Sequence, residues 1–318
     1  IRVVLGSRGL GDVYKRQFPY SADNKRYHTY SYHLKQKFGG RVARVPLDAG
    51  FTCPNRGGTK GTGGCAFCSA RGSGDQIPPG GLAAQYAAGI KKLSKWPDAR
   101  YIPYLQAFSN TYAPVERLKA IYGEALSLPG AVGLAVATRA DCIDEERAAL
   151  LASYAAQTDL TVELGLQTIH DRTGAVLNRG EGFADFRRAV AWLRARGVTV
   201  WAHLIDGLPG ETREMMVESA RVLGKMDVQG VKIHLMHYLR GTALAPMHHL
   251  ALTREDYVRT VCDQLEALPA EMVVGRLTGD GPDGLLLAPL WSRRKREVLN
   301  EIDRELVRRD SWQGKTAG

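Results

Sequence analysis

Hydrophobic and polar positions alternate along the chain in two kinds of segment. Short apolar runs typical of buried strands occupy 41–47, 100–108, 131–138, 159–167, 198–205 and 229–236. Between them lie segments with helical periodicity, at 82–95, 115–127, 144–155, 183–196 and 212–225. Strands that alternate with helices in this way predict βα units around a parallel sheet. We therefore expect an α/β fold with six strands.

Length and composition agree with this expectation. The chain has 318 residues, of which 44% are hydrophobic and 24% charged, and it contains no apolar run long enough to cross a bilayer. Such a length accommodates an α/β barrel with a small appendage. Five cysteines without a recognisable signal peptide favour a reducing compartment, so we expect a cytoplasmic protein with no membrane partner.

The first 17 residues differ from the rest. They begin without Met, and Gly9 to Gln17 read like a translated sequencing adaptor. A disordered basic leader is the alternative, and the lack of an apolar run disfavours a targeting segment. We expect a non-native, adaptor-derived leader at 1–17, a core barrel at 18–245 and a C-terminal extension at 246–318.

Three cysteines in a glycine-rich loop carry the clearest chemical signal. Cys53, Cys65 and Cys68 follow the first expected strand with the spacing C-x11-C-x2-C. A cubane iron–sulfur cluster normally takes four thiolates, so three leave one iron open to another ligand. Structural zinc is the alternative, but it takes four closed ligands and no second short Cys/His pair follows. A disulfide framework is less consistent with a reducing compartment.

The residues around these cysteines resemble a known family. Residues 45–69 read VPLDAGFTCPNRGGTKGTGGCAFCS, similar to the cluster loop of the radical S-adenosylmethionine (SAM) superfamily and, within it, of the YhcC/YtqA-type proteins with their elongator-like core. The resemblance implies an open (β/α)6 partial TIM barrel in which Cys53, Cys65 and Cys68 bind a [4Fe–4S] cluster. It also implies that SAM binds the open iron, that an electron donor such as flavodoxin or ferredoxin reduces the cluster, and that the enzyme abstracts hydrogen from a substrate.

Polar residues after the second expected strand are candidates for the SAM site, because sites assemble at the carboxyl ends of parallel strands. The stretch 106–112 resembles the family's QAxTNTY segment. The resemblance implies SAM contacts for Gln106, Asn110 and Thr111 through their amides and hydroxyl. A polar turn that caps the next helix is the alternative.

Two later strand ends also resemble family segments. After the third strand, TRADC resembles TRPDC, which implies a cofactor contact for Arg139. After the fifth strand, a segment like GLPGE implies that Ile205 and Gly207 lie against the adenine, while a helix start is the alternative. A segment like NRGH carries Glu181 where His is usual, so no role is transferred to it.

The fourth and sixth strands carry inward polar residues. Alternation places Glu163 and Gln167 on one face, and such groups are costly on an apolar strand unless they are satisfied. The resemblance to ELGxQ implies that this acidic position lies near SAM. Lys232 and His234 share a face of the sixth strand and are candidate catalytic residues for charge pairing or proton transfer, with a structural role as the alternative.

The net charge of the chain bears on the class of substrate that the protein binds. The formal net charge is +10, and the expected helix 292–309 is rich in Arg and Lys. Both suit RNA, and a solvated, salt-bridged surface explains them equally well. The family's relatives favour a wobble-uridine side chain in tRNA. A small molecule or a peptide is the alternative substrate, and a non-catalytic, zinc-stabilised nucleic-acid-binding module is the alternative class of protein.

Overall fold

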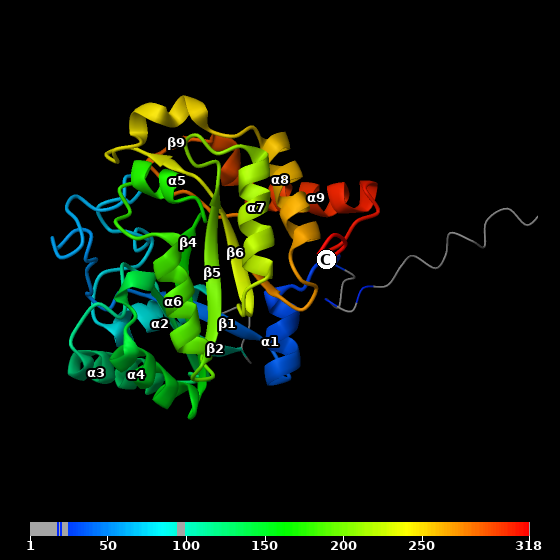
Figure 1. The fold of residues 1–318 in the computed structure, drawn as a ribbon. Helices are drawn as coiled ribbons and strands as arrows, with labels where there is room; N and C mark the ends of the chain where they lie inside the picture. Colours follow the sequence, from blue (N-terminus) through cyan, green and yellow to red (C-terminus); the bar gives the residue numbers. More distant parts are fainter. Residues whose placement is uncertain (1–17, 19, 21–24, 94–98, 318) are drawn as a thin grey trace, which may run out of the picture.

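The computed structural model describes residues 18, 20, 25–93 and 99–317 (Figure 1). The predicted leader at 1–17 lies outside these residues. The centre of the fold is a seven-stranded sheet in the order β1-β2-β3-β4-β5-β6-β8, with parallel pairing throughout. The sheet curves into an open half-barrel (Figure 1), which confirms the expected α/β architecture.

The six predicted strands are all present. They are β1 (Val42–Leu47), β2 (Arg100–Leu105), β3 (Gly133–Thr138), β4 (Asp159–Gln167), β5 (Thr199–Asp206) and β6 (Gly230–Leu235). The predicted total of six was wrong, because β8 (Val273–Arg276) pairs in parallel with β6. The sheet therefore continues into the region assigned to the C-terminal extension.

Helices cover the outer face of the sheet (Figure 1). The five expected ones are α2 (Leu82–Lys92), α3 (Val115–Leu126), α4 (Glu145–Ala155), α6 (Phe183–Arg194) and α7 (Arg213–Gly224). A short α5 (Asp171–Val176) follows β4, and α8 (Arg254–Ala267) packs beside α7. The expected helix 292–309 is a 3-10 turn at Leu290–Arg294 followed by α9 (Lys295–Arg308), which packs on α8.

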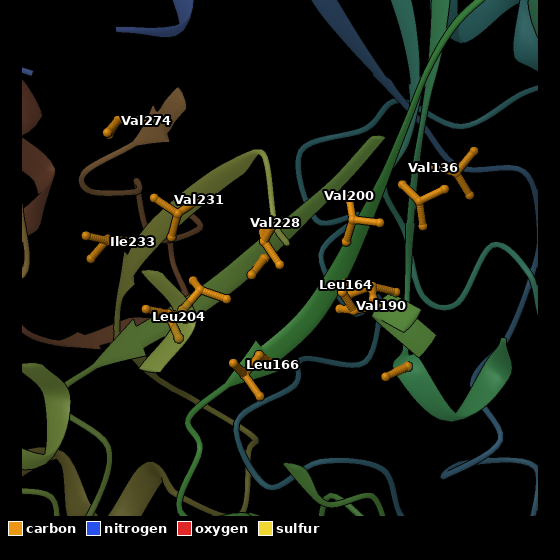
Figure 2. Close-up of a cluster of buried hydrophobic side chains, with 14 of the residues drawn as sticks. Val136, Leu164, Leu166, Val190, Val200, Leu204, Val228, Val231, Ile233 and Val274 are labelled. Carbon is orange, nitrogen blue, oxygen red and sulfur yellow. The ribbon is translucent and has the colours of Figure 1, made fainter. Parts of the chain in front are cut away.

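The main hydrophobic core lies between the sheet and these helices. Figure 2 shows part of it, where Val136, Leu164, Val200 and Val231 come from four adjacent strands and Val190 comes from α6. All five side chains are buried. Because strand residues alternate between faces, this core leaves the residues between them on the inner face of the half-barrel.

A helix that the sequence did not predict packs inside the curved sheet. This helix, α1 (Tyr30–Phe38), contacts β1 and β8, and its Leu34 joins an inner cluster with Val42, Ile102 and Tyr104. The hydroxyl of Thr29 accepts a hydrogen bond from the Tyr32 amide at 3.3 Å and begins the helix. Part of the barrel interior is therefore filled.

Two short strands, β7 (Tyr238–Leu239) and β9 (Leu286–Ala288), pair antiparallel beyond the main sheet. They join the region after β6 to the segment before α9. None of the helices in the described residues combines the length and the apolar composition needed to cross a membrane.

Candidate active site

A cavity of about 450 Å³ collects side chains from the strand ends and from the inner face of the sheet. Ten of the predicted site residues line it: Cys53, Cys65, Cys68, Gln106, Arg139, Glu163, Gln167, Ile205, Lys232 and His234. Residues more than a hundred positions apart thus meet in one concave site, which is the usual form of a ligand site. Their individual roles remain predictions.

Three other predicted site residues do not line the cavity. Asn110 is fully buried and its amide donates to the carbonyls of Leu105, Ala107 and Ala137, at 3.0, 3.1 and 2.9 Å. Thr111 is also fully buried and donates to the Cys142 carbonyl at 3.0 Å. These bonds tie the loop after β2 to β3, so the two residues support the cavity wall from behind.

Gly207 is the third of these residues. Its φ is +83°, and a Cβ there would lie 3.1 Å from Leu252. Glycine is therefore required by the backbone conformation and by close packing. The structure thus shows packing roles for Asn110, Thr111 and Gly207, and their contact with SAM stays a prediction.

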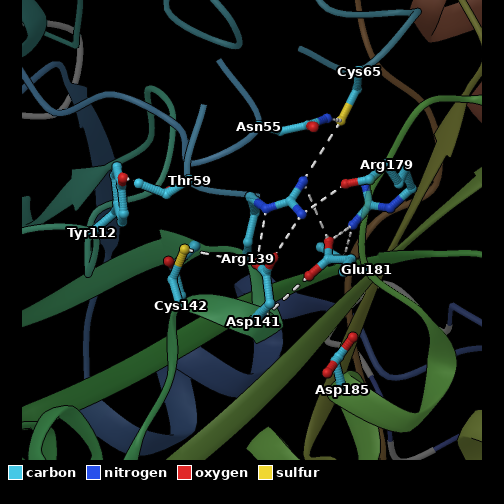
Figure 3. Close-up of polar contacts among 12 residues, drawn as sticks. Asn55, Thr59, Cys65, Tyr112, Arg139, Asp141, Cys142, Arg179, Glu181 and Asp185 are labelled. Atoms are coloured by element: carbon cyan, nitrogen blue, oxygen red, sulfur yellow. Dashed lines mark hydrogen bonds and ion pairs between the residues drawn. The ribbon is translucent and has the colours of Figure 1, made fainter. Parts of the chain in front are cut away.

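The cysteine loop presents all three of its thiols to the cavity. Cys65 Sγ accepts from Asn55 Nδ2 at 3.6 Å and from Arg139 Nη1 at 3.8 Å (Figure 3). The hydrogen bond between Cys65 and Cys68 lowers the pKa of the Cys65 thiol and, together with burial, raises that of the Cys68 thiol. The charges of Arg179 and Arg139 lower the pKa of Cys65 further. The thiolate is the form that binds metals, so this environment favours ligation by Cys65.

The remaining cysteines are placed differently. Cys142 contacts Asp141 and does not line the cavity, and Cys262 is fully buried in α8. Burial raises the pKa of the Cys262 thiol to about 12. A buried, protonated thiol behaves as a small hydrophobic side chain.

The residues around the three cysteines suit an iron–sulfur cluster by their charge and donor type. As placed, no three His, Cys, Asp or Glu side chains in the described part of the chain come close enough together to hold a metal ion. The three thiols share one cavity with the guanidinium groups of Arg56, Arg139 and Arg179. Thiolates in a positively charged pocket suit an anionic iron–sulfur cluster, and three of them leave a position for SAM.

A buried ion network holds Arg139 against the cysteine loop (Figure 3). Arg139 donates from two nitrogens to the two carboxylate oxygens of Asp141, both at 2.9 Å, and donates to the Arg179 carbonyl at 2.7 Å. Arg179 pairs with Glu181, whose carboxylate accepts from the Asp141 amide at 3.2 Å. Bidentate pairing orients a guanidinium strongly, so Glu181 completes the support of Arg139.

A second charged cluster lies on the inner face of the sheet. Glu163 is fully buried, pairs with Arg44 and with Lys232, and accepts from His203 Nε2 at 2.8 Å. Burial alone would raise the pKa of Glu163, but Arg44, Lys232 and His203 hold it well below its usual range. Burial lowers the pKa of Lys232 to about 7, although Glu163 opposes this shift. Glu163 is therefore saturated with protein partners.

Sequence reasoning missed several residues of the cavity region. Arg44 is the charged position within the apolar run VARVPL, a signal comparable to the one that identified Glu163. Tyr104 and His203 line the cavity on the inner face of β2 and β5. Arg276 also lines it, from the end of the unpredicted β8, so no local signal could have placed it there.

Comparison with known proteins supports one family. Residues 55–223 match the model of the radical SAM superfamily, and residues 228–308 match that of the radical SAM C-terminal domain. The chain is 48% identical to the uncharacterized protein YtqA of Bacillus subtilis (strain 168) over 305 residues, 94% of this chain and 95% of that protein. It is 35% identical to the protein YhcC of Escherichia coli (strain K12) over 279 residues, 86% of this chain and 90% of that protein.

A solved structure supports the fold. The archaeal Elp3 of Methanocaldococcus infernus superimposes with a TM-score of 0.63 at 18% identity, over 86% of this chain and 64% of the longer Elp3 chain. At that identity the likeness establishes a shared fold only. The two family matches cover the barrel and the region after it, and a [4Fe–4S] cluster and SAM are the cofactors that this family implies. The chain is an enzyme and belongs to the radical SAM superfamily.

Proposed function

We propose that the enzyme holds a [4Fe–4S] cluster on Cys53, Cys65 and Cys68 and abstracts hydrogen from a substrate bound in the adjoining cavity. When bound, the cluster and SAM supply the 5′-deoxyadenosyl radical that removes the hydrogen. One observation carries the proposal: the three thiols line the same cavity as the inward polar residues of β4, β5 and β6.

The chain's own residues would hold and orient the reactants. Arg139 lies beside Cys65 and balances the negative charge of the thiolate. The amide nitrogen of Gln106 donates to the Ser73 carbonyl at 2.5 Å, so its amide oxygen and the side chain of Gln167 are the groups proposed to orient the polar part of SAM. Ile205 offers an apolar contact for the adenine. The protein thereby aims the radical and limits contact with water.

Lys232 and His234 are the proposed substrate-side residues. Both line the cavity from β6, on the inner face of the sheet. The Lys232 ammonium is held by Glu163 and by the Tyr104 hydroxyl, and burial lowers its pKa, which suits charge pairing or proton transfer. His234 lies next to His203, with ring centroids 4.9 Å apart.

Anaerobic reconstitution tests the proposed function. The reconstituted chain should show the broad visible absorption of an iron–sulfur cluster and should form 5′-deoxyadenosine from SAM when a reductant is added. Flavodoxin or ferredoxin is the proposed physiological electron donor, in the cytoplasm. Zinc at the cysteines together with no SAM cleavage would favour the non-catalytic nucleic-acid-binding module.

RNA is the proposed substrate class, with a wobble-uridine side chain in tRNA as its most specific form. The observation that favours it is the position of α9. Arg293, Arg294 and Arg296 are exposed at its start, and Lys295 Nζ lies 3.4 Å from Asp280, which lines the cavity. The basic start of α9 thus adjoins the cavity, as an electrostatic guide for a polyanion would.

Analysis of a deletion strain separates RNA from other substrates. Loss of one modified nucleoside from bulk tRNA would support the RNA proposal. Accumulation of an unmodified metabolite or peptide, with tRNA unchanged, would favour the alternative substrate classes and leave the radical chemistry intact.

A further inference from the structure

One wall of the cavity is unusually rich in basic side chains. His203 comes from β5, Lys232 and His234 from β6, His237 from the residues just after β6, and Arg276 from the end of β8. We call these five residues the basic wall. They belong to three adjacent strands, so the curvature of the sheet brings them to one side of the site.

The basic wall is only partly neutralised by the protein. The carboxylate of Glu163 pairs with the ammonium of Lys232 and accepts a hydrogen bond from His203. The side chain of Arg276 lines the cavity, is exposed to solvent, and makes no hydrogen bond or ion pair with any residue that the structure describes. The nearby Asp280 is itself engaged by a lysine of α9. Arg276 is therefore a cation that faces the cavity without a partner among the described side chains.

Two imidazoles beside Arg276 each have a ring nitrogen that also lacks a partner among the described residues and, unlike Arg276, is shielded from solvent. The Nε2 atoms of His234 and His237 are buried and have no hydrogen-bond partner among the described residues. Burial lowers the pKa of His237 to about 4; the charge of Asp280 opposes this shift and that of Arg276 adds to it. Burial also lowers the pKa of His234, with contributions from His203 and Arg276. The positive potential of Arg276 thus reaches both rings.

An anion at this wall would have partners on both sides. The buried Nε2 atoms of His234 and His237 lack a partner among the described residues, which is costly, and the exposed guanidinium of Arg276 is open to a ligand. A guanidinium binds the two oxygens of a carboxylate or a phosphate through parallel N–H bonds. The cavity is also lined by Glu163, Asp75 and Asp280. The attraction for an anion is therefore local to Arg276.

We propose that the basic wall is a subsite for an anionic group of the substrate, a carboxylate or a phosphate, with Arg276 as its principal partner and His234 and His237 beside it. The inference rests on the proposed function, because it requires the cavity to hold a substrate together with SAM. The substrate would then carry its anionic group in the same cavity as the hydrogen that is removed.

Calorimetric titration tests the subsite directly. The full chain, reconstituted anaerobically and saturated with SAM, is titrated with inorganic phosphate and separately with acetate, at constant ionic strength set with chloride. SAM is present at a saturating concentration so that phosphate or acetate does not bind at the position of the SAM carboxylate. We expect saturable binding with a Kd on the order of 1 mM. Tighter phosphate binding indicates a phosphate group on the substrate, and tighter acetate binding indicates a carboxylate.

Variants localise the binding. Arg276→Gln should weaken the affinity at least about tenfold, because it removes a charged bidentate donor. Arg276→Lys should keep part of the affinity. Arg304→Gln, which changes an exposed arginine of α9 outside the cavity, is the matched control and should bind like the unaltered chain.

The outcomes separate this inference from the function on which it rests. Saturable binding that is lost in Arg276→Gln and kept in Arg304→Gln supports the subsite. No saturable binding by the unaltered chain, or equal binding by Arg276→Gln, overturns it. Formation of 5′-deoxyadenosine in the same samples is scored separately: its presence without anion binding removes only the subsite, and its absence removes the proposed function.

Discussion

The ammonium of Lys232 lies 2.5 Å from the carboxylate of Glu163, deep in the inner face of the sheet. The other carboxylate oxygen of Glu163 pairs with Arg44, and Lys232 also donates to the Tyr104 hydroxyl at 3.3 Å. One buried acid therefore links side chains of β1, β4 and β6. Breaking such a pair by removing one partner is costly, because the other charge stays buried.

The first prediction concerns this pair. Glu163→Gln should lower the free energy of unfolding by about 3–5 kcal/mol, because two buried cations lose their counter-ion. Lys232→Met should cost less, since Glu163 keeps Arg44 and His203 as partners. Urea denaturation of the cluster-free chain measures both changes. The variant that carries both substitutions completes a double-mutant cycle. A coupling energy below about 0.5 kcal/mol in this cycle would show that Glu163 and Lys232 act independently.

The second prediction concerns the cluster ligands. Cys65→Ser should abolish incorporation of a [4Fe–4S] cluster, seen as loss of about four iron atoms per chain and of visible absorption. Cys262→Ser is the matched control, because Cys262 is buried in α8 and contacts the Ile302 carbonyl. It should bind as much iron as the unaltered chain. Full iron content in Cys65→Ser would remove Cys65 from the ligand set.

The third prediction concerns pH. Burial raises the pKa of Asp206 from 3.8 to about 8, and only one of its carboxylate oxygens is hydrogen-bonded, by Gln264 Nε2 at 2.7 Å. Between these pH values the folded chain keeps a proton that the unfolded chain has released. The contribution of Asp206 to stability is therefore complete below about pH 4 and is lost as the pH rises to about 8, by at most about 1.4 kcal/mol per pH unit.

Asp206→Asn should flatten this dependence, because an amide does not ionise. Urea denaturation of both proteins at several pH values between about 5 and 8 gives the comparison. Parallel curves for the two proteins would mean that Asp206 ionises alike in the folded and unfolded states.

The fourth prediction concerns the start of α9. Replacing Arg293, Arg294 and Arg296 together by Ala should make the dependence of log affinity for tRNA on log salt concentration shallower, by about 0.7–0.9 per lost phosphate contact. Fluorescence anisotropy at several salt concentrations measures this slope. Arg308→Ala is the control, since Arg308 lies at the far end of α9 and pairs with Glu305. An unchanged slope in the triple variant would refute RNA guidance by α9.

Local patterns predicted most of the barrel and left out two parts. The alternation along β4 correctly placed Glu163 on the inner face, toward the cavity, because alternation is a property of the strand itself. The helix α1 was missed because only Leu34 among its residues is buried, which leaves a weak hydrophobic pattern. The strand β8 was missed because it is four residues long and ends in Gly275 and Arg276.

The sequence by itself determined the cysteine loop and the family, since the spacing of Cys53, Cys65 and Cys68 and their neighbours are local features. Only the tertiary structure decided which polar side chains face the cavity. The amide nitrogen of Asn110 donates to carbonyls behind the wall, whereas Arg276 is brought into the cavity by the pairing of β8 with β6. The use of a polar group depends on its partners in space, and those partners come from distant segments of the chain.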